Sequence, residues 1–268
     1  MNYAEIESKL IVIIKRAVNY ALKKEYSITQ KGNEENIVTS SDFLIQEFLI
    51  KNLKKLLPES GFLCEENNFL DFNHEFVWVI DPIDGTTNFS RKIKNCAVSV
   101  ALLNKQKPII GVVYNIFNRE LFSARQGCGA KLNDKTIKVS DNPFKNSILC
   151  TAMSLYNKEY APICSDIIND AYLKCNDIRR FGSCALELCY IAAGMCDLYF
   201  EIRVFPWDYA AGMLILQEAG GILTGLNYEK PNYAKPTALI GANSSENYNI
   251  LNSIINKHLK ILPYEENL

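Results

Sequence analysis

The sequence predicts a mixed α/β fold, in which buried strands alternate with amphipathic helices. Residues 3–24 and 42–57 place apolar side chains at the 3.6-residue spacing of helices that bury one face. By contrast, residues 76–80 form an unbroken run of β-branched and aromatic side chains, as in a strand that is buried on both faces. The chain has 268 residues, of which 48% are hydrophobic, so it can bury the large core that such a fold needs.

The remaining elements follow in order along the chain. Turn residues separate three further strand-like runs at 97–103, 109–114 and 120–124. A second group of elements begins near residue 147; it consists of strands at 148–152, 222–224 and 238–241 and helices at 157–171, 185–193, 207–219 and 246–259. We predict one unit over residues 1–268, which can be divided into an N-terminal lobe, 1–145, and a C-terminal lobe, 146–268.

The charge and hydropathy of the chain argue against two classes of partner. The net charge is −1, so the sequence lacks the basic surface that displaces counterions from nucleic acid, and we expect no nucleic-acid partner. No stretch approaches 18 consecutive apolar residues, and the N-terminus lacks the pattern of a signal peptide. We therefore expect no membrane contact and a cytoplasmic location.

The cysteines and histidines limit the kinds of metal site. Nine cysteines are spread along the chain without a Cys-x-x-Cys pair, which favours free thiols over disulfides or a zinc site. The only histidines are His74 and His258. Any metal bound by this protein is therefore expected to have oxygen ligands.

The most informative motif is Asp-Pro-Ile-Asp-Gly-Thr-Thr-Asn at residues 81–88. It sets the carboxylates of Asp81 and Asp84 three residues apart, directly after a predicted buried strand that should end at Asp81. This is the edge at which open α/β sheets bind ligands. Gly85 allows the backbone to approach a ligand closely, and the N–H group of Thr86 can face a phosphate. A simple polar turn would not need two acids behind an apolar strand, so the motif predicts metal-assisted phosphate chemistry.

Acids in three other segments can complete such a site. Asp42 and Asp208 each open a predicted helix, where an acid is often only a cap. Glu65 and Glu66 follow an apolar run, and solvated loop charges are the alternative interpretation for both. A hard divalent ion needs several carboxylate oxygens, and two ions can share one of them, so we predict that these acids converge on Asp81, which is placed to bridge.

Taken together, these segments resemble the inositol monophosphatase family, within the lithium-sensitive, magnesium-dependent phosphatase superfamily. Their order and spacing agree over most of the chain. One departure is Cys64, where the family usually has a glycine before the glutamates. The resemblance implies a layered α-β-α-β-α sandwich of the inositol monophosphatase and fructose-1,6-bisphosphatase type. The matching segments are Lys31, Val38-Thr39-x-x-Asp42, Glu65-Glu66, residues 78–89, Trp207-Asp208 and residues 218–221.

The resemblance implies two to three magnesium ions in each site. The first would be held by Glu65, Asp81 and the carbonyl group of Ile83. The second would be held by Asp81, Asp84 and Asp208, and a third, weaker ion would share Glu65. Such ions neutralise phosphate oxygens, lower the pKa of a bound water and stabilise the leaving alkoxide, so no covalent intermediate is needed.

The resemblance also implies catalytic roles for Asp42, Thr86 and Glu65. Asp42 and Thr86 would orient the attacking water and help to deprotonate it, although the Thr86 hydroxyl could also cap the helix that it begins. The N–H groups of Gly85 and Thr86 would hold the phosphate. Lys31 could steady the water region, but a solvated loop lysine is an equally good interpretation.

Five residues match family positions that contact substrate hydroxyls. For Glu201 the alternative is a surface acid on an edge strand, and for Arg179 and Arg180, which could reach a second phosphate, it is a pair of solvated charges. The five residues are Asp84, Gly182, Ser183, Ala185 and Glu201.

We therefore expect a magnesium-dependent phosphate monoester hydrolase that acts on inositol monophosphate or a related small sugar phosphate. By resemblance it would be lithium-sensitive and homodimeric. Alternatives within the superfamily are fructose-1,6-bisphosphatase, nucleotide 3′-phosphatase and NADP phosphatase, and a further alternative is a regulatory protein of this fold that binds a protein or RNA partner. A haloacid-dehalogenase-type phosphatase fits poorly, because its two acids are separated by one residue, whereas two residues separate Asp81 from Asp84.

Overall fold

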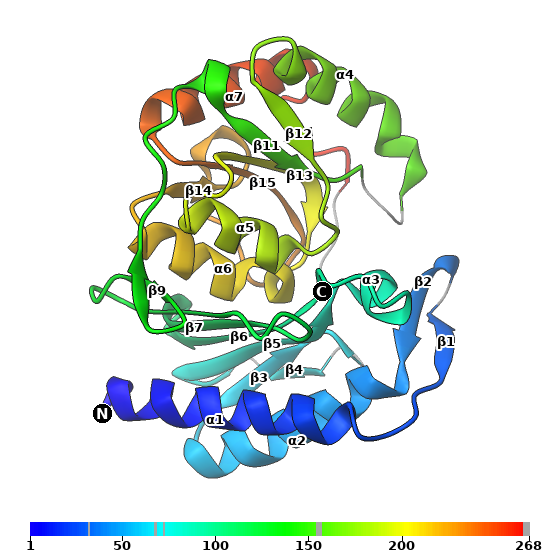
Figure 1. The fold of residues 1–268 in the computed structure, drawn as a ribbon, viewed down its shortest axis with the longest axis vertical. Helices are drawn as coiled ribbons and strands as arrows, with labels where there is room; N and C mark the ends of the chain where they lie inside the picture. The colour runs from blue at the N-terminus through cyan, green and yellow to red at the C-terminus, as the bar shows by residue number, and fades with distance from the viewer. Residues whose placement is uncertain (32, 67–68, 72, 154–156, 265–268) are drawn as a thin grey trace.

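The computed structural model describes residues 1–31, 33–66, 69–71, 73–153 and 157–264. Its elements stack in five layers (Figure 1), which confirms the predicted α-β-α-β-α sandwich. An eight-stranded sheet and a five-stranded sheet form the two β layers. The three helical layers are α1 (Tyr3–Ala21) with α2 (Ser40–Leu56), α5 (Cys184–Ala192) with α6 (Pro206–Glu218), and α4 (Ala161–Tyr172) with α7 (Ser245–His258).

The two N-terminal helices pack against the eight-stranded sheet through an apolar core that includes Leu10 and Leu49. Helix α1 ends at Ala21, slightly before the predicted end at residue 24. Helix α2 begins at Ser40 instead of residue 42, because Thr39 is its N-cap. Between the helices lies a hairpin of β1 (Ile28–Lys31) and β2 (Asn33–Thr39), which the polar sequence of this segment did not predict.

The eight-stranded sheet has the order β10-β9-β8-β7-β6-β5-β3-β4. Strands β5 and β3 run parallel, and all other neighbours are antiparallel. All four strands predicted for this half of the chain are present, whereas the short strands β3, β4, β9 and β10 were not predicted. The strands are β3 (Gly61–Cys64), β4 (Phe69–Asp71), β5 (Phe76–Asp84), β6 (Ala97–Asn104), β7 (Lys107–Asn115), β8 (Leu121–Arg125), β9 (Ala130–Leu132) and β10 (Lys135–Ile137).

Strand β5 lies inside the sheet, between β6 and β3, and is buried from residue 77 onward. The prediction that it ends at Asp81 is wrong, since the strand continues to Asp84. It continues through a bulge, because Asp81 pairs with Ser99 and Asp84 with Ala97, which sets two residues of β5 opposite one of β6. One of these two residues of β5 is Pro82, which has no N–H group to donate to the ladder.

The five-stranded sheet has the order β12-β11-β13-β15-β14. Strand β11 pairs in parallel with β12 and β13, and the other pairs are antiparallel. The predicted helix at 157–171 begins as a 3₁₀ turn, η3 (Lys158–Tyr160), and continues as α4. The strands are β11 (Ile148–Thr151), β12 (Asp177–Arg179), β13 (Leu198–Val204), β14 (Ile222–Thr224) and β15 (Thr237–Ala242), and two more 3₁₀ turns are η2 (Phe144–Asn146) and η4 (Leu226–Tyr228).

The cysteines are free thiols, as predicted. Most of them are buried, whereas Cys128 is exposed. None of the helices formed by the described residues has the length and apolar character of a membrane-spanning segment.

Candidate functional site

The motif at residues 81–88 forms the turn from strand β5 into the short helix α3 (Thr86–Ser90). Gly85 joins the two elements with a φ of +90°, which L-residues with a side chain rarely adopt. A Cβ atom at this position would lie 2.9 Å from the carbonyl oxygen of Gly182 and 3.0 Å from that of Asn95. Only glycine therefore fits here, and the backbone of residues 182 and 95 closes tightly around the turn.

Asp81 provides the most unusual group of the site. Its side chain is 2% exposed, and Oδ1 accepts no hydrogen bond from any described residue. Burial raises the pKa of Asp81 well above its ordinary value, and the nearby charges of Glu65, Asp84 and Asp208 raise it further. A buried carboxylate oxygen without a donor, surrounded by other acids, is a strong acceptor for a cation.

The neighbouring acids are held by backbone and hydroxyl donors. Asp84 Oδ2 accepts hydrogen bonds from Ser183 Oγ at 2.6 Å and from the Ala185 N–H at 2.7 Å. Burial raises the pKa of Asp84 to about 7, although these hydrogen bonds oppose the shift. Asp208 accepts a hydrogen bond from the Phe205 N–H at 2.7 Å, which also caps helix α6. The alternative interpretation of Asp208 as a cap is thus correct, but its carboxyl group also adds to the acid cluster.

Asp42 is likewise both a cap residue and a neighbour of the site. Its Oδ2 atom accepts hydrogen bonds from the N–H of Thr39 at 2.8 Å and from the Thr39 hydroxyl at 2.6 Å. The Thr86 hydroxyl donates to Asp42 Oδ1 at 3.4 Å and to the Ile83 carbonyl at 3.0 Å. Burial raises the pKa of Asp42 to about 7, with a further contribution from the charge of Glu65. The structure thus brings together the predicted pair of Asp42 and Thr86.

Glu65 follows strand β3 directly. Cys64 pairs with Ile80 in register, and the Glu65 N–H donates to the Ile80 carbonyl at 3.2 Å, so the cysteine does not disturb the backbone. The next residue, Glu66, is 2% exposed, and its backbone is fixed by the side chain of Gln46. Glu65 therefore approaches Asp81 from the neighbouring strand, as predicted, and solvated loop charges do not describe these two residues.

The predicted substrate residues lie at the start of helix α5 and on strand β13. Ser183 is the N-cap of α5, and Gly182 precedes it with a φ of +79°. Glu201 is half-buried and accepts a hydrogen bond from the Tyr199 hydroxyl at 2.7 Å. The alternative that Glu201 is an edge-strand acid is wrong, because β13 is the middle strand of its sheet. Burial raises the pKa of Glu201 to about 7, and the charge of Asp84 contributes.

The basic residues named in the sequence differ in their surroundings. Arg179 is exposed and forms an ion pair with Asp177, as the interpretation of a solvated charge implies. Arg180 is exposed too, but its charge lowers the pKa of Glu201 and therefore acts near the site. The side chain of Lys31 lies outside the part of the chain that the structure describes.

Two residues hold the site together without having been predicted. The Asn88 amide group donates to the carbonyl oxygens of Asn95 and Phe181, both at 2.7 Å. On the other side, the buried carboxylate of Glu187 accepts hydrogen bonds from the N–H groups of Phe181 at 2.7 Å and Gly182 at 3.0 Å. The only sequence signal was the place of Asn88 within the motif, since Glu187 stands in an otherwise apolar helix.

The donor set of this site fits a hard divalent cation. It contains carboxylate oxygens of Asp81, Asp84, Asp208 and Glu65, and the orphaned Oδ1 atom of Asp81 lacks any other described partner. Within the described residues, however, no three acid, histidine or cysteine side chains already form a ready-made metal site. The chemistry of these carboxylates nevertheless suits the attraction of a cation.

Comparison with known proteins identifies the relatives of this chain and of its fold. A model of the inositol monophosphatase family matches residues 2–260. Nus factor SuhB of Escherichia coli (strain K12) is 38% identical over 218 residues, which cover 79% of this chain and 81% of SuhB. The crystal structure of the extragenic suppressor protein suhB from Bartonella henselae is 30% identical, with a TM-score of 0.85 over 93% of this chain and 98% of the other.

A third similar protein is SaIMPase-II, which was solved with two ligands. With inositol monophosphate bound it is 27% identical to this chain, with a TM-score of 0.79 over 92% of each chain. With 2′AMP bound it is 28% identical, with a TM-score of 0.82 over 95% of each chain. Fold and matches together define a phosphatase of the layered α/β class. More closely, the chain belongs to the inositol monophosphatase family.

The raised pKa values predict how the stability of the metal-free protein depends on pH. Asp42 and Asp84 ionise near pH 4 in an unfolded chain but near pH 7 in the fold. The folded state therefore binds more protons in this window, and the free energy of unfolding should fall as pH rises from about 4 to about 7. We expect a loss on the order of a few kcal/mol, because each pKa unit corresponds to about 1.4 kcal/mol.

Urea unfolding of the chelated protein between pH 4.5 and pH 8 (~0.5 unit steps) measures this loss. Asp81→Asn removes one acid from the cluster and should flatten the pH dependence, whereas Asp166→Asn, at an exposed position of α4, should leave it as in the wild type. A wild-type stability that is constant or rises over this range would contradict the assignment.

Proposed function

We propose that this protein is a magnesium-dependent phosphate monoester hydrolase that acts on inositol monophosphate or a related small sugar phosphate. The observation that carries the proposal is the convergence of acids from separate segments around the buried, unpartnered Oδ1 atom of Asp81. Membership of the inositol monophosphatase family supports the reaction class. The inositol monophosphate bound to SaIMPase-II supports the substrate class.

In this proposal the carboxylates hold the ions. Glu65, Asp81 and the Ile83 carbonyl form one ligand set, and Asp81, Asp84 and Asp208 form the other, with Asp81 shared. All are hard oxygen donors of the kind that magnesium prefers, and a third ion would use Glu65. When bound, the ions would neutralise the phosphate and lower the pKa of a coordinated water.

The residues of the turn would position phosphate and water. The N–H groups of Gly85 and Thr86 start helix α3, where backbone donors have no helical acceptor and can hold phosphate oxygens. The Thr86 hydroxyl, within reach of Asp42, would accept a hydrogen bond from the attacking water and pass its own proton toward the Asp42 carboxylate. With a pKa of about 7, Asp42 is suited to take up that proton near neutral pH, while Glu65 orients the water from the other side.

The alcohol part of the substrate would lie toward helix α5 and strand β13. Asp84, the loop of Gly182 and Ser183, the N–H of Ala185, and Glu201 are the polar groups on that side. Two carboxylates with raised pKa values are good acceptors for substrate hydroxyl groups. This supports a small polyol or sugar as the alcohol.

Several phosphate esters of this class are candidate substrates. SaIMPase-II binds 2′AMP as well as inositol monophosphate, so nucleotide esters are candidate substrates in addition to sugar phosphates. Fructose-1,6-bisphosphatase, nucleotide 3′-phosphatase and NADP phosphatase activities are the alternatives, and kcat/KM over a panel of these esters ranks them. Lithium inhibition and a homodimer are expected from the resemblance, and a cytoplasmic location is part of the proposal.

Phosphate release in the presence of Mg²⁺ tests the central role of the acids. Asp81→Asn, Asp84→Asn and Asp208→Asn should each lower kcat by at least about 10³-fold, because each removes several kcal/mol of charge stabilisation and 1.4 kcal/mol corresponds to tenfold in rate. Asp166→Asn is the matched control and should retain full activity. Turnover that persists after thorough treatment with EDTA would disprove the metal-dependent mechanism.

A regulatory role is a second candidate, favoured by one observation. The 38% identical relative in Escherichia coli is named a Nus factor. If this chain shares that role through its surface, then both the wild type and Asp81→Asn should replace SuhB in an Escherichia coli strain that lacks it. The experiment measures whether each protein restores the wild-type phenotype of that strain when both proteins are expressed at the same level. Failure of both proteins would argue against this candidate and leave the hydrolase proposal unaffected.

A further inference from the structure

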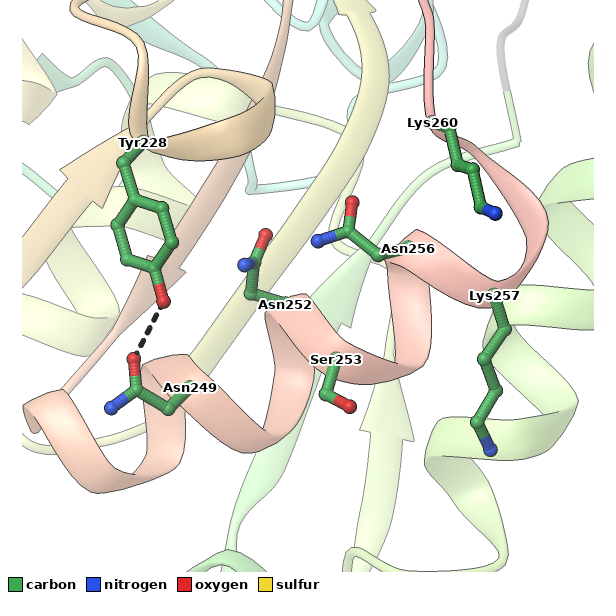
Figure 2. A pocket seen from close by; sticks show the side chains of 7 residues that line it. All are labelled: Tyr228, Asn249, Asn252, Ser253, Asn256, Lys257 and Lys260. Atoms are coloured by element: carbon green, nitrogen blue, oxygen red, sulfur yellow. Dashed lines mark hydrogen bonds between the residues drawn. The ribbon is translucent and has the colours of Figure 1, made fainter.

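The outer face of helix α7 forms a polar groove that is separate from the acid cluster. The groove has a volume of about 590 Å³, within the usual range for small-ligand sites. Figure 2 shows that α7 supplies one wall through Asn249, Asn252, Ser253 and Asn256, and that Tyr228 of η4 stands opposite. The helix packs with its other face on β15 and β13, so the groove opens on the outermost layer (Figure 1).

The composition of this face is unusual for a helix. Residues 249, 252, 253 and 256 are spaced at i, i+3, i+4 and i+7, so their side chains share one face. Exposed helix faces commonly carry Glu, Lys, Gln or Arg, whereas Asn is a weaker helix former. Three asparagines and a serine in these positions thus lower the helix propensity, which a binding role for the carboxamides would explain.

Two of the carboxamide oxygens are buried without a hydrogen-bond donor. Asn252 is only 5% exposed, and its Oδ1 atom accepts no hydrogen bond from the described residues. The Oδ1 atom of Asn256, a half-buried residue, likewise accepts no hydrogen bond from the described residues. By contrast, Asn249 Oδ1 accepts a hydrogen bond from the Tyr228 hydroxyl at 2.8 Å. A buried acceptor without a donor destabilises the fold, so a ligand whose hydroxyl donors reach these two oxygens after a rotation of the carboxamide groups would relieve this cost at two neighbouring positions.

The ends of the groove differ in chemistry. Lys257 and Lys260 line the C-terminal end of α7, and Figure 2 shows both on the side away from Tyr228. The only described acid paired with either lysine is Asp170, whose carboxylate lies 3.8 Å from Lys257 Nζ. At the other end, Tyr228 is 57% exposed, and its ring offers an apolar surface beside the ring of Tyr248. The groove therefore presents a ring surface, two hydrogen-bond acceptors and a cationic end in sequence.

We propose that this groove binds a small polyhydroxylated anion, that is, a sugar phosphate or a sugar acid. The sugar hydroxyls would donate to Asn252 and Asn256, the sugar ring would lie against Tyr228, and the anionic group would reach Lys257 and Lys260. The site does not use any residue of the acid cluster, so it functions as a second site, and it does not depend on the proposed hydrolase activity.

Calorimetric titration of the chelated protein tests the proposal, since EDTA removes the metal-dependent binding of phosphate esters elsewhere. The probes are D-glucose 6-phosphate, D-gluconate, D-glucose and inorganic phosphate. We expect D-glucose 6-phosphate or D-gluconate to bind at least tenfold more tightly than D-glucose or inorganic phosphate. The ratio of the dissociation constants of these two anions shows whether the groove prefers a phosphate or a carboxylate group. Equal binding of glucose, or no binding of any probe, would overturn the proposal.

Variants connect the binding to the groove. Asn252→Leu should weaken binding at least tenfold, and Lys260→Gln should weaken it several-fold with a reduced salt dependence. The matched control Asn169→Leu, on an exposed face of α4, and the acid-cluster variant Asp81→Asn should bind like the wild type. Loss of binding in Asp81→Asn, or unchanged binding in Asn252→Leu, would contradict the proposal.

Stability gives an independent check of Asn252. If its carboxamide is an unsatisfied group kept for a ligand, then Asn252→Leu should raise the melting temperature of the ligand-free protein, because an apolar side chain removes the unsatisfied acceptor. A lowered melting temperature would mean that Asn252 serves the fold itself, and the proposal would fail.

Discussion

The burial of Asp81 at the bulged end of an interior strand is the constraint on which the site depends. A carboxylate that is almost excluded from water is costly unless a partner compensates its charge. Here the surrounding acids add to that cost, and Oδ1 has no described donor. In the absence of a cation the fold can lower this cost only by taking up protons, which is why the acids of the cluster have raised pKa values. An oxygen-rich cation site follows from this electrostatic problem.

The backbone around the turn is fixed from both halves of the chain. The bulge in β5 carries Asp81 and Asp84 to one end of the strand, and Gly85 then turns the chain into α3 where no Cβ atom would fit. Asn88 and Glu187 hold the Phe181–Gly182 backbone from opposite sides. Because residues 181–182 and the turn at residues 85–88 share these contacts, residues 93 positions apart in sequence keep a defined geometry.

Much of this could be predicted from the sequence because the signals are local. The apolar run before Asp81 and the helical spacing in α1 and α2 are strong patterns, so the order of the main elements was correct, and the acids picked out by the sequence lie close together in the fold. The hairpin at residues 28–39 was missed because its sequence is polar, and the short strands were missed because runs of three or four residues form strands only through their neighbouring strands. The end of β5 was misjudged because a bulge with a proline is not visible as a periodic pattern. Glu187 could not be found, because its role depends on a fold that brings it to the loop.

The account's central claim is that Asp81 Oδ1 binds a cation shared by the neighbouring acids. The most direct test is a crystal structure of the protein grown with Mn²⁺, which occupies oxygen-rich magnesium sites and can be identified by its anomalous signal. The account predicts an anomalous peak in direct contact with Asp81 Oδ1, with Asp84 and Asp208 or Glu65 completing the ligands. An Asp81 Oδ1 atom that still has no ion beside it, with the peaks located elsewhere, would contradict the account.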